Sequence, residues 1–438
     1  MKSYLRSQNW QLSLYISLAI FILAIPILLI PNDWMGYLLF YLSFLILFLS
    51  KKIRKNQRYF IFIALSLSFH HAIAFYNSYF GTVSGGVADP ETFHKTAVDL
   101  AAFASYLPFS VGHKLYINLL SLMYQAFGAS KLLGHEFSVL MYSISCIFFV
   151  ELIHSLHWQR FQVRLILLYG LLPSAIIHRS LTQRESLQSL FFLLSAYCII
   201  KLRQKPKFNW IASFFMSSIC LGLLHHGLLL YAVFLMIFGL YLALNTNNRK
   251  NGLKNKLFWA FIVLGVCTAW FALAGSTQYG ASQVLLSGDI EYIESYQNYN
   301  TDSRASYGAT LDTSSWFGII RSLPLAYIHY LFAPFPWQVA TSVDIYAFVE
   351  AIFRLVLILS ALRTWYKLSG QQKSNHAFLM ISVLSVELLW CVGTKNWGTA
   401  IRHHVMSYSI LIAIGGPGLS TFINGLFPKR QHLRNNSY

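Results

Sequence analysis

The segment Gly85-Gly86-Val87-Ala88-Asp89-Pro90-Glu91-Thr92-Phe93-His94-Lys95 interrupts a chain that is otherwise very apolar. It follows three apolar runs and places two carboxylates and a histidine within six residues. Asp89-Pro90 ends any preceding helix, because proline lacks an N–H and restricts the residue before it. Pro90 then suits the first turn of a new helix with Asp89 as its N-cap. The apolar spacing over 91–106 predicts an amphipathic helix on a membrane surface; an ordinary capped surface helix is the alternative.

The composition indicates an all-α polytopic membrane protein. Of the 438 residues, 56% are hydrophobic and only 11% are charged, and many uncharged runs are long enough to cross a bilayer. Two further apolar stretches, 113–128 and 315–333, are expected to be re-entrant or interfacial helices. The prediction is a single transmembrane domain over 1–438 with about 12 transmembrane helices. These are expected at 10–30, 34–50, 59–76, 137–156, 163–178, 186–202, 209–224, 226–244, 257–275, 345–363, 377–394 and 404–424.

The charges sort by side in this topology. Of the 33 Lys and Arg residues, 23 fall in segments on one side, which the positive-inside rule makes cytoplasmic together with both termini. Three of the 15 acids lie in spans, Glu151, Glu350 and Glu387, and the other twelve are assigned to the outer face. The net charge of +18 therefore fits anionic lipid at the inner surface, and nothing indicates a nucleic-acid partner.

Several function classes find no support in the sequence. The five Cys all lie in apolar runs, where they resemble small core residues rather than disulfide partners or metal ligands. No Walker loop, dinucleotide fingerprint or nucleophile elbow is present.

Glu350 and Arg354, four residues apart on a predicted span, are expected to form a structural ion pair.

Basic residues mark two further outer turns. Arg179 and Arg184 lie in one of them, at the predicted membrane boundary, and Arg402 and His403 lie in the last. Charged groups are costly there unless they pair or meet a ligand, and arginine suits phosphate. A phosphate-binding role is one interpretation; the other is that Glu185 caps the next helix and pairs with Arg184.

The outer loop 276–314 combines carboxylates with tyrosines. Aromatic rings stack on sugar faces and carboxylates accept hydrogen bonds from sugar hydroxyls, so this composition favours sugar recognition. A solvated lid loop is the alternative. The loops 77–112 and 276–314 are expected to form the active-site face. The candidate sugar-binding residues are Tyr299, Asp302, Arg304 and Tyr307.

Four segments carry a family resemblance: ADPETFHKTAVDLA, LPSAIIHRSLTQRES, PFPW and NWGTAIRHH. Their order over most of 75–405 resembles the GT-C superfamily of integral-membrane glycosyltransferases. The resemblance implies a GT-C-like fold, with Asp89 as catalytic base or metal-supporting carboxylate. The chain departs from the family pattern because Pro90 separates Asp89 from Glu91, which leaves a divalent cation open as a cofactor; no metal ligands are assigned.

We therefore expect a glycosyltransferase at the outer face of a bacterial inner membrane. It would act on polyprenyl-phosphate-linked sugars in surface polysaccharide biosynthesis, alone or with other polysaccharide-assembly proteins. Asp89 would activate the acceptor hydroxyl with help from Glu91 or His94, while the outer-turn arginines hold the phosphate. An oligosaccharide repeat-unit polymerase or ligase is the nearest alternative, and a transporter of lipid-linked sugars comes next.

Overall fold

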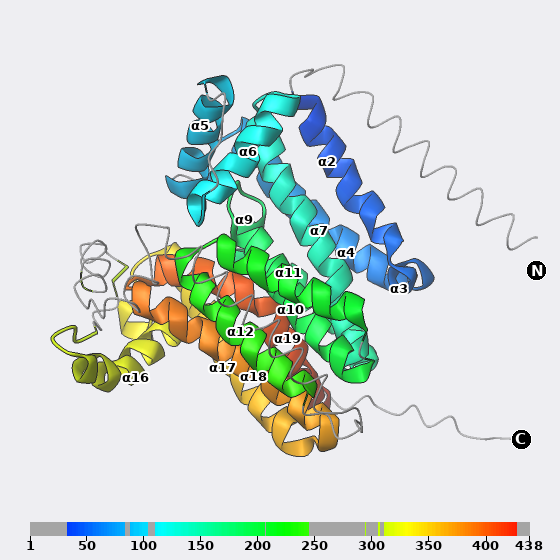
Figure 1. The fold of residues 1–438 in the computed structure, drawn as a ribbon, viewed down its shortest axis with the longest axis vertical. Coiled ribbons are helices and arrows are strands. Elements are labelled where there is room, and N and C mark those ends of the chain that lie inside the picture. The colour runs from blue at the N-terminus through cyan, green and yellow to red at the C-terminus, as the bar shows by residue number, and fades with distance from the viewer. Residues whose placement is uncertain are drawn as a thin grey trace, which may run out of the picture. The chain divides into compact units, whose positions relative to one another are not determined.

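The computed structural model describes residues 33–83, 88–103, 110–205, 207–244, 294, 305–306 and 311–426 (Figure 1). This part of the chain is helical, and its strand-like pairing is an isolated bridge between Ser306 and Asn396. The chain forms two compact units. Unit 1 comprises Met1–Ile147 and Ile176–Leu187, and unit 2 comprises Phe148–Ala175 and Gln188–Tyr438. The single transmembrane domain stays a prediction.

The helices begin and end close to the predicted boundaries. Unit 1 holds the whole or the larger part of α2 (Trp34–Leu45), η2 (Ile46–Leu49), α3 (Lys51–Lys55), α4 (Gln57–Tyr79), α5 (Ala88–Phe103), α6 (His113–Phe127), α7 (Lys131–Ser155) and α9 (Pro173–Arg179). Unit 2 holds the whole or the larger part of η3 (Gln159–Phe161), α8 (Gln162–Gly170), α10 (Glu185–Gln204), α11 (Phe208–Leu223), α12 (His226–Leu244), α16 (Trp316–Phe332), η4 (Pro336–Gln338), α17 (Ser342–Lys367), α18 (Gly370–Gly393) and α19 (Trp397–Leu426).

Six of the described helices are long and apolar enough to cross a membrane: α4, α7, α10, α17, α18 and α19. A seventh span results if α8 and α9, bent by 62°, count as one. Shorter apolar helices match the predictions at 34–50, 209–224 and 226–244, whereas 10–30 and 257–275 lie outside the described residues. The stretches 113–128 and 315–333 are the helices α6 and α16, and their re-entrant or interfacial placement stays a prediction.

In unit 1, α4 packs between α2 and α7. The ring of His70 stacks on Tyr142 with their centroids 4.0 Å apart, and the Ser66 hydroxyl lies 2.6 Å from the Tyr142 hydroxyl. His71 Nδ1 lies 2.8 Å from a carboxylate oxygen of Glu136, and both side chains are buried. Because α7 begins at Lys131, Glu136 lies within this helix and is buried against α4, while its assignment to the outer face stays a prediction.

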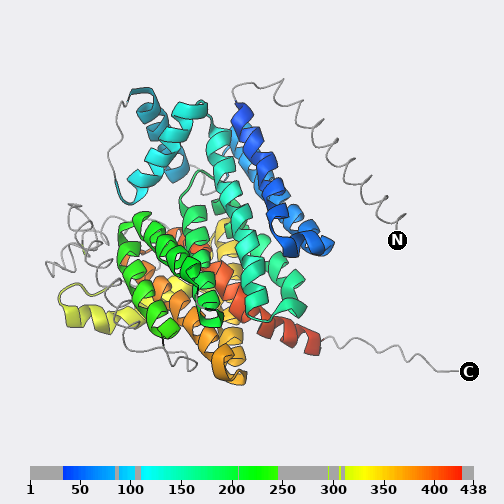
Figure 2. The same ribbon diagram turned by 45° about the vertical axis from the view of Figure 1, so that its right-hand side comes forward.

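In unit 2, α19 packs tightly along α17. An added Cβ at Gly418 would lie only 2.8 Å from the Ser360 carbonyl oxygen, and one at Gly415 would collide with the Leu357 carbonyl. Small residues let helix backbones approach this closely, which is how helices in a lipid environment gain packing energy. The two views of the ribbon show α17, α18 and α19 running side by side (Figure 1 and Figure 2).

Candidate functional site

The first group of predicted site residues lies at the start of α5 in unit 1. Asp89 and Glu91 occupy the first turn of this helix, which begins at Ala88. Asp89 therefore lies inside the first turn. The prediction from the sequence that Asp89 is the N-cap was wrong. The difference arises because proline is tolerated throughout the first turn, where the N–H groups have no partner within the helix. Asp89 is half-buried and faces the favourable positive end of the helix dipole.

Glu91 is held by two lysines. Its carboxylate oxygens lie 3.0 Å from Lys131 Nζ and 3.6 Å from Lys95 Nζ. The hydrogen bond from Lys131 is the largest cause that lowers the pKa of Glu91 below its ordinary value. A carboxylate with a lowered pKa is a weaker base, so this position suits anchoring of α5 to α7 better than proton abstraction.

His94 faces α6. Its Nδ1 lies 2.9 Å from the Tyr124 hydroxyl, and the two rings meet edge to face. Burial is the largest cause that lowers the pKa of His94, and the positive charge of Lys131 adds to the effect. The imidazole is therefore neutral at pH 7 and joins α5 to α6.

The charges of Asp89 and Arg184 both act on the imidazole of His113. The pKa of His113, at the first position of α6, is lowered by partial burial, then by the charges of Arg184 and Lys114, and it is raised by the charge of Asp89. The three neighbours therefore share the electrostatic environment of His113. Since Asp89 and Arg184 are 95 positions apart in the chain, the fold has joined two of the predicted outer segments.

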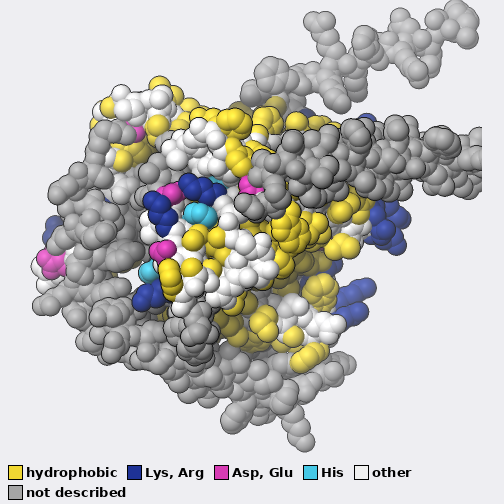
Figure 3. Space-filling model, turned by 90° about the horizontal axis from the view of Figure 1, so that it is seen from above, with side chains coloured by type: hydrophobic (Ala, Val, Ile, Leu, Met, Phe, Trp, Pro, Cys, Tyr) yellow, Lys and Arg dark blue, Asp and Glu magenta, His cyan; other side chains and the backbone are white. Residues whose placement is uncertain are grey.

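His113 and Lys114 are candidate site residues that the sequence prediction missed. They are the first residues of the apolar run 113–128, which was predicted only as a re-entrant or interfacial helix. The available signal was two adjacent basic residues immediately after Gly112, where α6 begins. Seen from above, Lys, Arg, Asp, Glu and His side chains gather in one area of the surface, next to hydrophobic side chains (Figure 3).

The two predicted phosphate-binding arginines of unit 1 differ in placement. Arg179 is 0% exposed, and its guanidinium carbon lies 5.4 Å from the centroid of the Tyr142 ring. Arg184 is partly exposed and belongs to the environment of His113. Of these two arginines, Arg184 is therefore the one placed to meet a ligand from outside the unit.

His135 fixes the loop that carries Arg184. Its Nδ1 accepts hydrogen bonds from the backbone N–H and the hydroxyl of Thr182, at 2.9 and 2.8 Å. Its Nε2 lies 3.0 Å from the side-chain amide of Asn77, whose oxygen accepts the backbone N–H of Val83 at 3.1 Å. One buried histidine on α7 thus connects the segment after α4 with the segment before α10.

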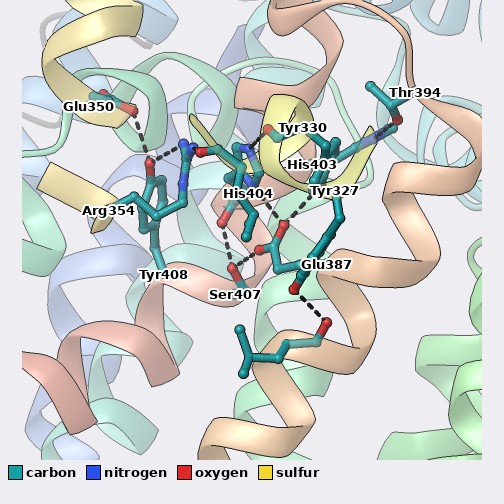
Figure 4. A network of polar contacts seen from close by, with 12 residues as sticks. Tyr327, Tyr330, Glu350, Arg354, Glu387, Thr394, His403, His404, Ser407 and Tyr408 are labelled. Carbon is teal, nitrogen blue, oxygen red and sulfur yellow. Dashed lines mark hydrogen bonds and ion pairs between the residues drawn. The ribbon is translucent and has the colours of Figure 1, made fainter. Parts of the chain in front are cut away.

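Unit 2 contains a second polar group, buried among helices that could span a membrane. His404 on α19 places Nδ1 2.6 Å from a Glu387 carboxylate oxygen and Nε2 3.2 Å from the backbone carbonyl of Tyr330 (Figure 4). The Tyr330 hydroxyl donates to the same Glu387 oxygen at 2.9 Å, and the Ser407 hydroxyl donates to the other. Both nitrogens of His404 therefore lie within hydrogen-bonding distance of oxygen atoms, so the imidazole is held between the Glu387 carboxylate and the backbone of α16.

The neighbouring charges Glu350 and Arg354 do not form the predicted direct ion pair. The Tyr408 hydroxyl lies between them: Arg354 Nη2 donates to it at 2.8 Å, and it donates to a Glu350 oxygen at 3.3 Å (Figure 4). Arg354 also donates to the carbonyl of Leu331, and Glu350 accepts the backbone N–H and the hydroxyl of Ser174 at 2.8 and 2.6 Å. The prediction was wrong because each charge finds partners on other helices, which sequence spacing does not reveal.

The remaining predicted phosphate-binding residues, Arg402 and His403, lie at the start of α19 in unit 2. His403 Nδ1 lies 3.0 Å from the Thr394 hydroxyl, and its ring stacks on Trp390 with centroids 4.0 Å apart. Arg402 is partly exposed. Lys395, in the preceding turn, is buried, and this burial lowers its pKa.

The predicted sugar-binding residues lie outside the described residues: Tyr299, Asp302, Arg304 and Tyr307. Within the described ranges, no group of three His, Cys, Asp or Glu side chains could hold a metal ion. A divalent cation as cofactor stays a prediction.

Comparison with known proteins leaves the function to be argued from the chain itself. No protein-family model, no curated protein and no solved structure matches this sequence.

Proposed function

We propose that the chain is an integral-membrane glycosyltransferase that uses a polyprenyl-phosphate-linked sugar or oligosaccharide as donor. The observation that carries the proposal is that Asp89, in the first turn of α5, and the partly exposed Arg184 both act electrostatically on His113 at the start of α6. These residues supply a carboxylate for proton abstraction and cations that suit a phosphate leaving group. They lie where helices long enough to cross a membrane give way to loops and shorter helices.

The reaction assigns each group a role. The Asp89 carboxylate takes the proton of the acceptor hydroxyl, whose oxygen attacks the anomeric carbon of the donor sugar. The bond between that carbon and the phosphate oxygen breaks, and the phosphate leaves with the electron pair. Arg184 and Lys114 stabilise the negative charge on the leaving group. His94 and Glu91 hold α5 in place rather than transfer protons.

The proposal includes the finer architecture expected from the sequence. It places about 12 spans and two re-entrant or interfacial helices in a GT-C-like fold, in the inner membrane of a bacterium with both termini in the cytoplasm. The site would then face outward, where lipid-linked sugars are consumed in surface polysaccharide biosynthesis. The loop 276–314 would close over the sugars.

The test compares surface glycans of cells that carry variants of this chain at equal protein levels. Asp89→Asn is expected to lower product by at least about 100-fold, the typical contribution of a general base. Asp99→Asn is the matched control, because Asp99 is an exposed carboxylate on the same helix. Full activity of Asp89→Asn would overturn the assignment of the base. Loss of a polymer ladder identifies a polymerase or ligase, and loss of one sugar mass identifies a single-sugar transferase.

A second candidate is a transporter of lipid-linked sugars. It is favoured by the buried group of Glu387, His404, Glu350 and Arg354, since ionisable residues inside membrane segments often mark transport or proton pathways. An unchanged glycan product in Asp89→Asn cells, with transport lost in Glu387→Gln cells, would favour this function.

A further inference from the structure

We propose that unit 2 binds the phosphate headgroup of an anionic phospholipid in a pocket at the ends of α17 and α19. The pocket has a volume of about 470 Å³. The inference is independent of the proposed glycosyl transfer. Three segments form its walls: η3 with the residues beside it, the last turn of α17, and the end of α19. Its lining residues are Trp158, Arg160, Phe161, Arg363, Thr364, Lys367, Leu368, Pro417, Gly418, Thr421, Phe422 and Gly425.

The pocket carries positive charge without a counter-charge. Arg160, Arg363 and Lys367 line it, whereas no acidic residue does. Within the described part of the chain, none of these three cations forms an ion pair or a hydrogen bond. Arg363 and Lys367 are four residues apart on α17 and so lie on the same helix face. Like charges this close repel one another, and an anion between them relieves the repulsion.

The geometry suits a phosphate attached to an apolar molecule. The guanidinium carbon of Arg160 lies 4.4 Å from the centroid of the Phe161 ring, which orients the planar donor group. The rest of the lining includes the rings of Trp158 and Phe422. A basic rim beside apolar walls matches a phospholipid better than a free anion, which gains nothing from the apolar part.

The location of the pocket at helix ends agrees with binding of a lipid headgroup. Two of its walls are the ends of helices long enough to cross a membrane, at Lys367 and Gly425. Arg160, Arg363 and Lys367 are among the 23 basic residues on the side that the positive-inside rule makes cytoplasmic. Basic pockets between helices on that side recognise anionic headgroups, and the inner leaflet is rich in anionic lipid.

The test titrates delipidated full-length protein in maltoside detergent with dioleoylphosphatidylglycerol, with binding read by native mass spectrometry. Each basic residue near an anionic lipid strengthens binding by about fivefold, so Arg363→Gln/Lys367→Gln is expected to raise the Kd by about 30-fold. The matched control, Arg54→Gln/Lys55→Gln, removes the same charge from exposed positions on α3 and is expected to change the Kd by less than about twofold.

Two further variants separate pocket binding from misfolding. Gly425→Leu adds a side chain where a Cβ meets no atom within 4 Å, so it takes up pocket space without a backbone clash and is expected to weaken binding. Arg363→Lys/Lys367→Arg keeps both charges and is expected to retain binding within about fivefold. All variants are first compared with the parent protein by size-exclusion elution.

Three outcomes would overturn the inference. Equal weakening by the Arg54/Lys55 control would show attraction to diffuse surface charge. Equal affinity for dioleoylphosphatidylcholine would show that the headgroup charge is not recognised. Competition by inorganic phosphate alone at a Kd equal to that of the lipid would show a site for a soluble anion.

Discussion

Nδ1 of His404 lies 2.6 Å from the carboxylate of Glu387, and the two residues belong to neighbouring helices, α19 and α18. Both side chains are almost fully buried. Removing one partner of a buried pair leaves the other without compensation, which typically costs about 3–5 kcal/mol. The pair therefore makes the packing of α18 against α19 depend on the chemistry of both residues.

The first prediction concerns that pair. His404→Phe is expected to lower the free energy of unfolding by about 3–5 kcal/mol, because Glu387 stays buried without its partner. Glu387→Leu is expected to destabilise similarly, and the double variant less than the sum of the two. Denaturation of purified protein in detergent, followed by near-UV circular dichroism, measures the cycle. Strict additivity would show that the two residues act independently.

The second prediction concerns Tyr408, whose hydroxyl stands between Arg354 and Glu350. Tyr408→Phe is expected to cost about 1.5–3 kcal/mol, the range for hydrogen bonds to charged groups. Tyr231→Phe is the control, since its hydroxyl donates only to the carbonyl of Ser382, at 2.8 Å, and its loss is expected to cost about 1 kcal/mol. Midpoints of thermal unfolding rank the variants; equal shifts would contradict a special role for Tyr408.

The third prediction concerns the contact of α19 with α17. Gly415→Ala places a methyl group against the Leu357 backbone carbonyl, which has no freedom to move aside, and is expected to cost at least about 1–3 kcal/mol. Gly425→Ala meets open space and is expected to be neutral or to stabilise by up to about 1 kcal/mol, because alanine favours helix. Guanidinium unfolding midpoints test the contrast, which disappears if the helices separate easily.

The fourth prediction concerns pH. His94 has a lowered pKa in the folded protein, so the unfolded chain takes up the proton first as the pH falls below its ordinary value of 6.5. The contribution of His94 to stability is present above pH 6.5 and is lost as the pH falls through the lowered pKa. His94→Gln is expected to lose less stability than the parent between pH 7.5 and pH 5.5, values chosen about one unit either side of the ordinary pKa.

Glu91 also contributes stability that is lost as the pH falls, but over a lower pH range than His94. Its pKa is also lowered, so its stabilising effect is present above its ordinary value of 4.5 and is lost as the pH falls through the lowered pKa. Lys131→Met removes the largest cause of that shift. Melting temperatures between pH 6 and pH 3.5, on either side of that ordinary value, separate the two residues; an identical pH profile for Lys131→Met and the parent would contradict the ion pair.

The sequence predicted the described helices well because helices that cross a membrane consist of long runs of apolar residues. The described helices near 59–76, 137–156 and 345–363 follow directly from hydropathy. It could not predict which buried charges meet. Glu136 lies one residue before a predicted span, and its position in the sequence did not indicate that it pairs with His71 from another helix.

The candidate site was predicted in part for a related reason. Asp89 and Arg184 were chosen by their positions at predicted outer turns, and the charges of both act on His113. Arg179 satisfied the same criterion, yet its side chain is 0% exposed. Charge at a turn indicates the depth of a residue in the membrane, whereas the direction of its side chain depends on tertiary packing that a single sequence does not record.

At the 62° bend between α8 and α9, Glu350 has a second structural role. A break inside a span exposes backbone N–H groups at the start of the second helix, where apolar surroundings offer no water. Glu350 accepts the N–H of Ser174 in that first turn, so a carboxylate on α17, distant in the sequence, caps the start of α9. Ser174 and Glu350 both belong to unit 2, so within this unit a shift of α17 by one helical turn would remove the hydrogen bond to the first turn of α9.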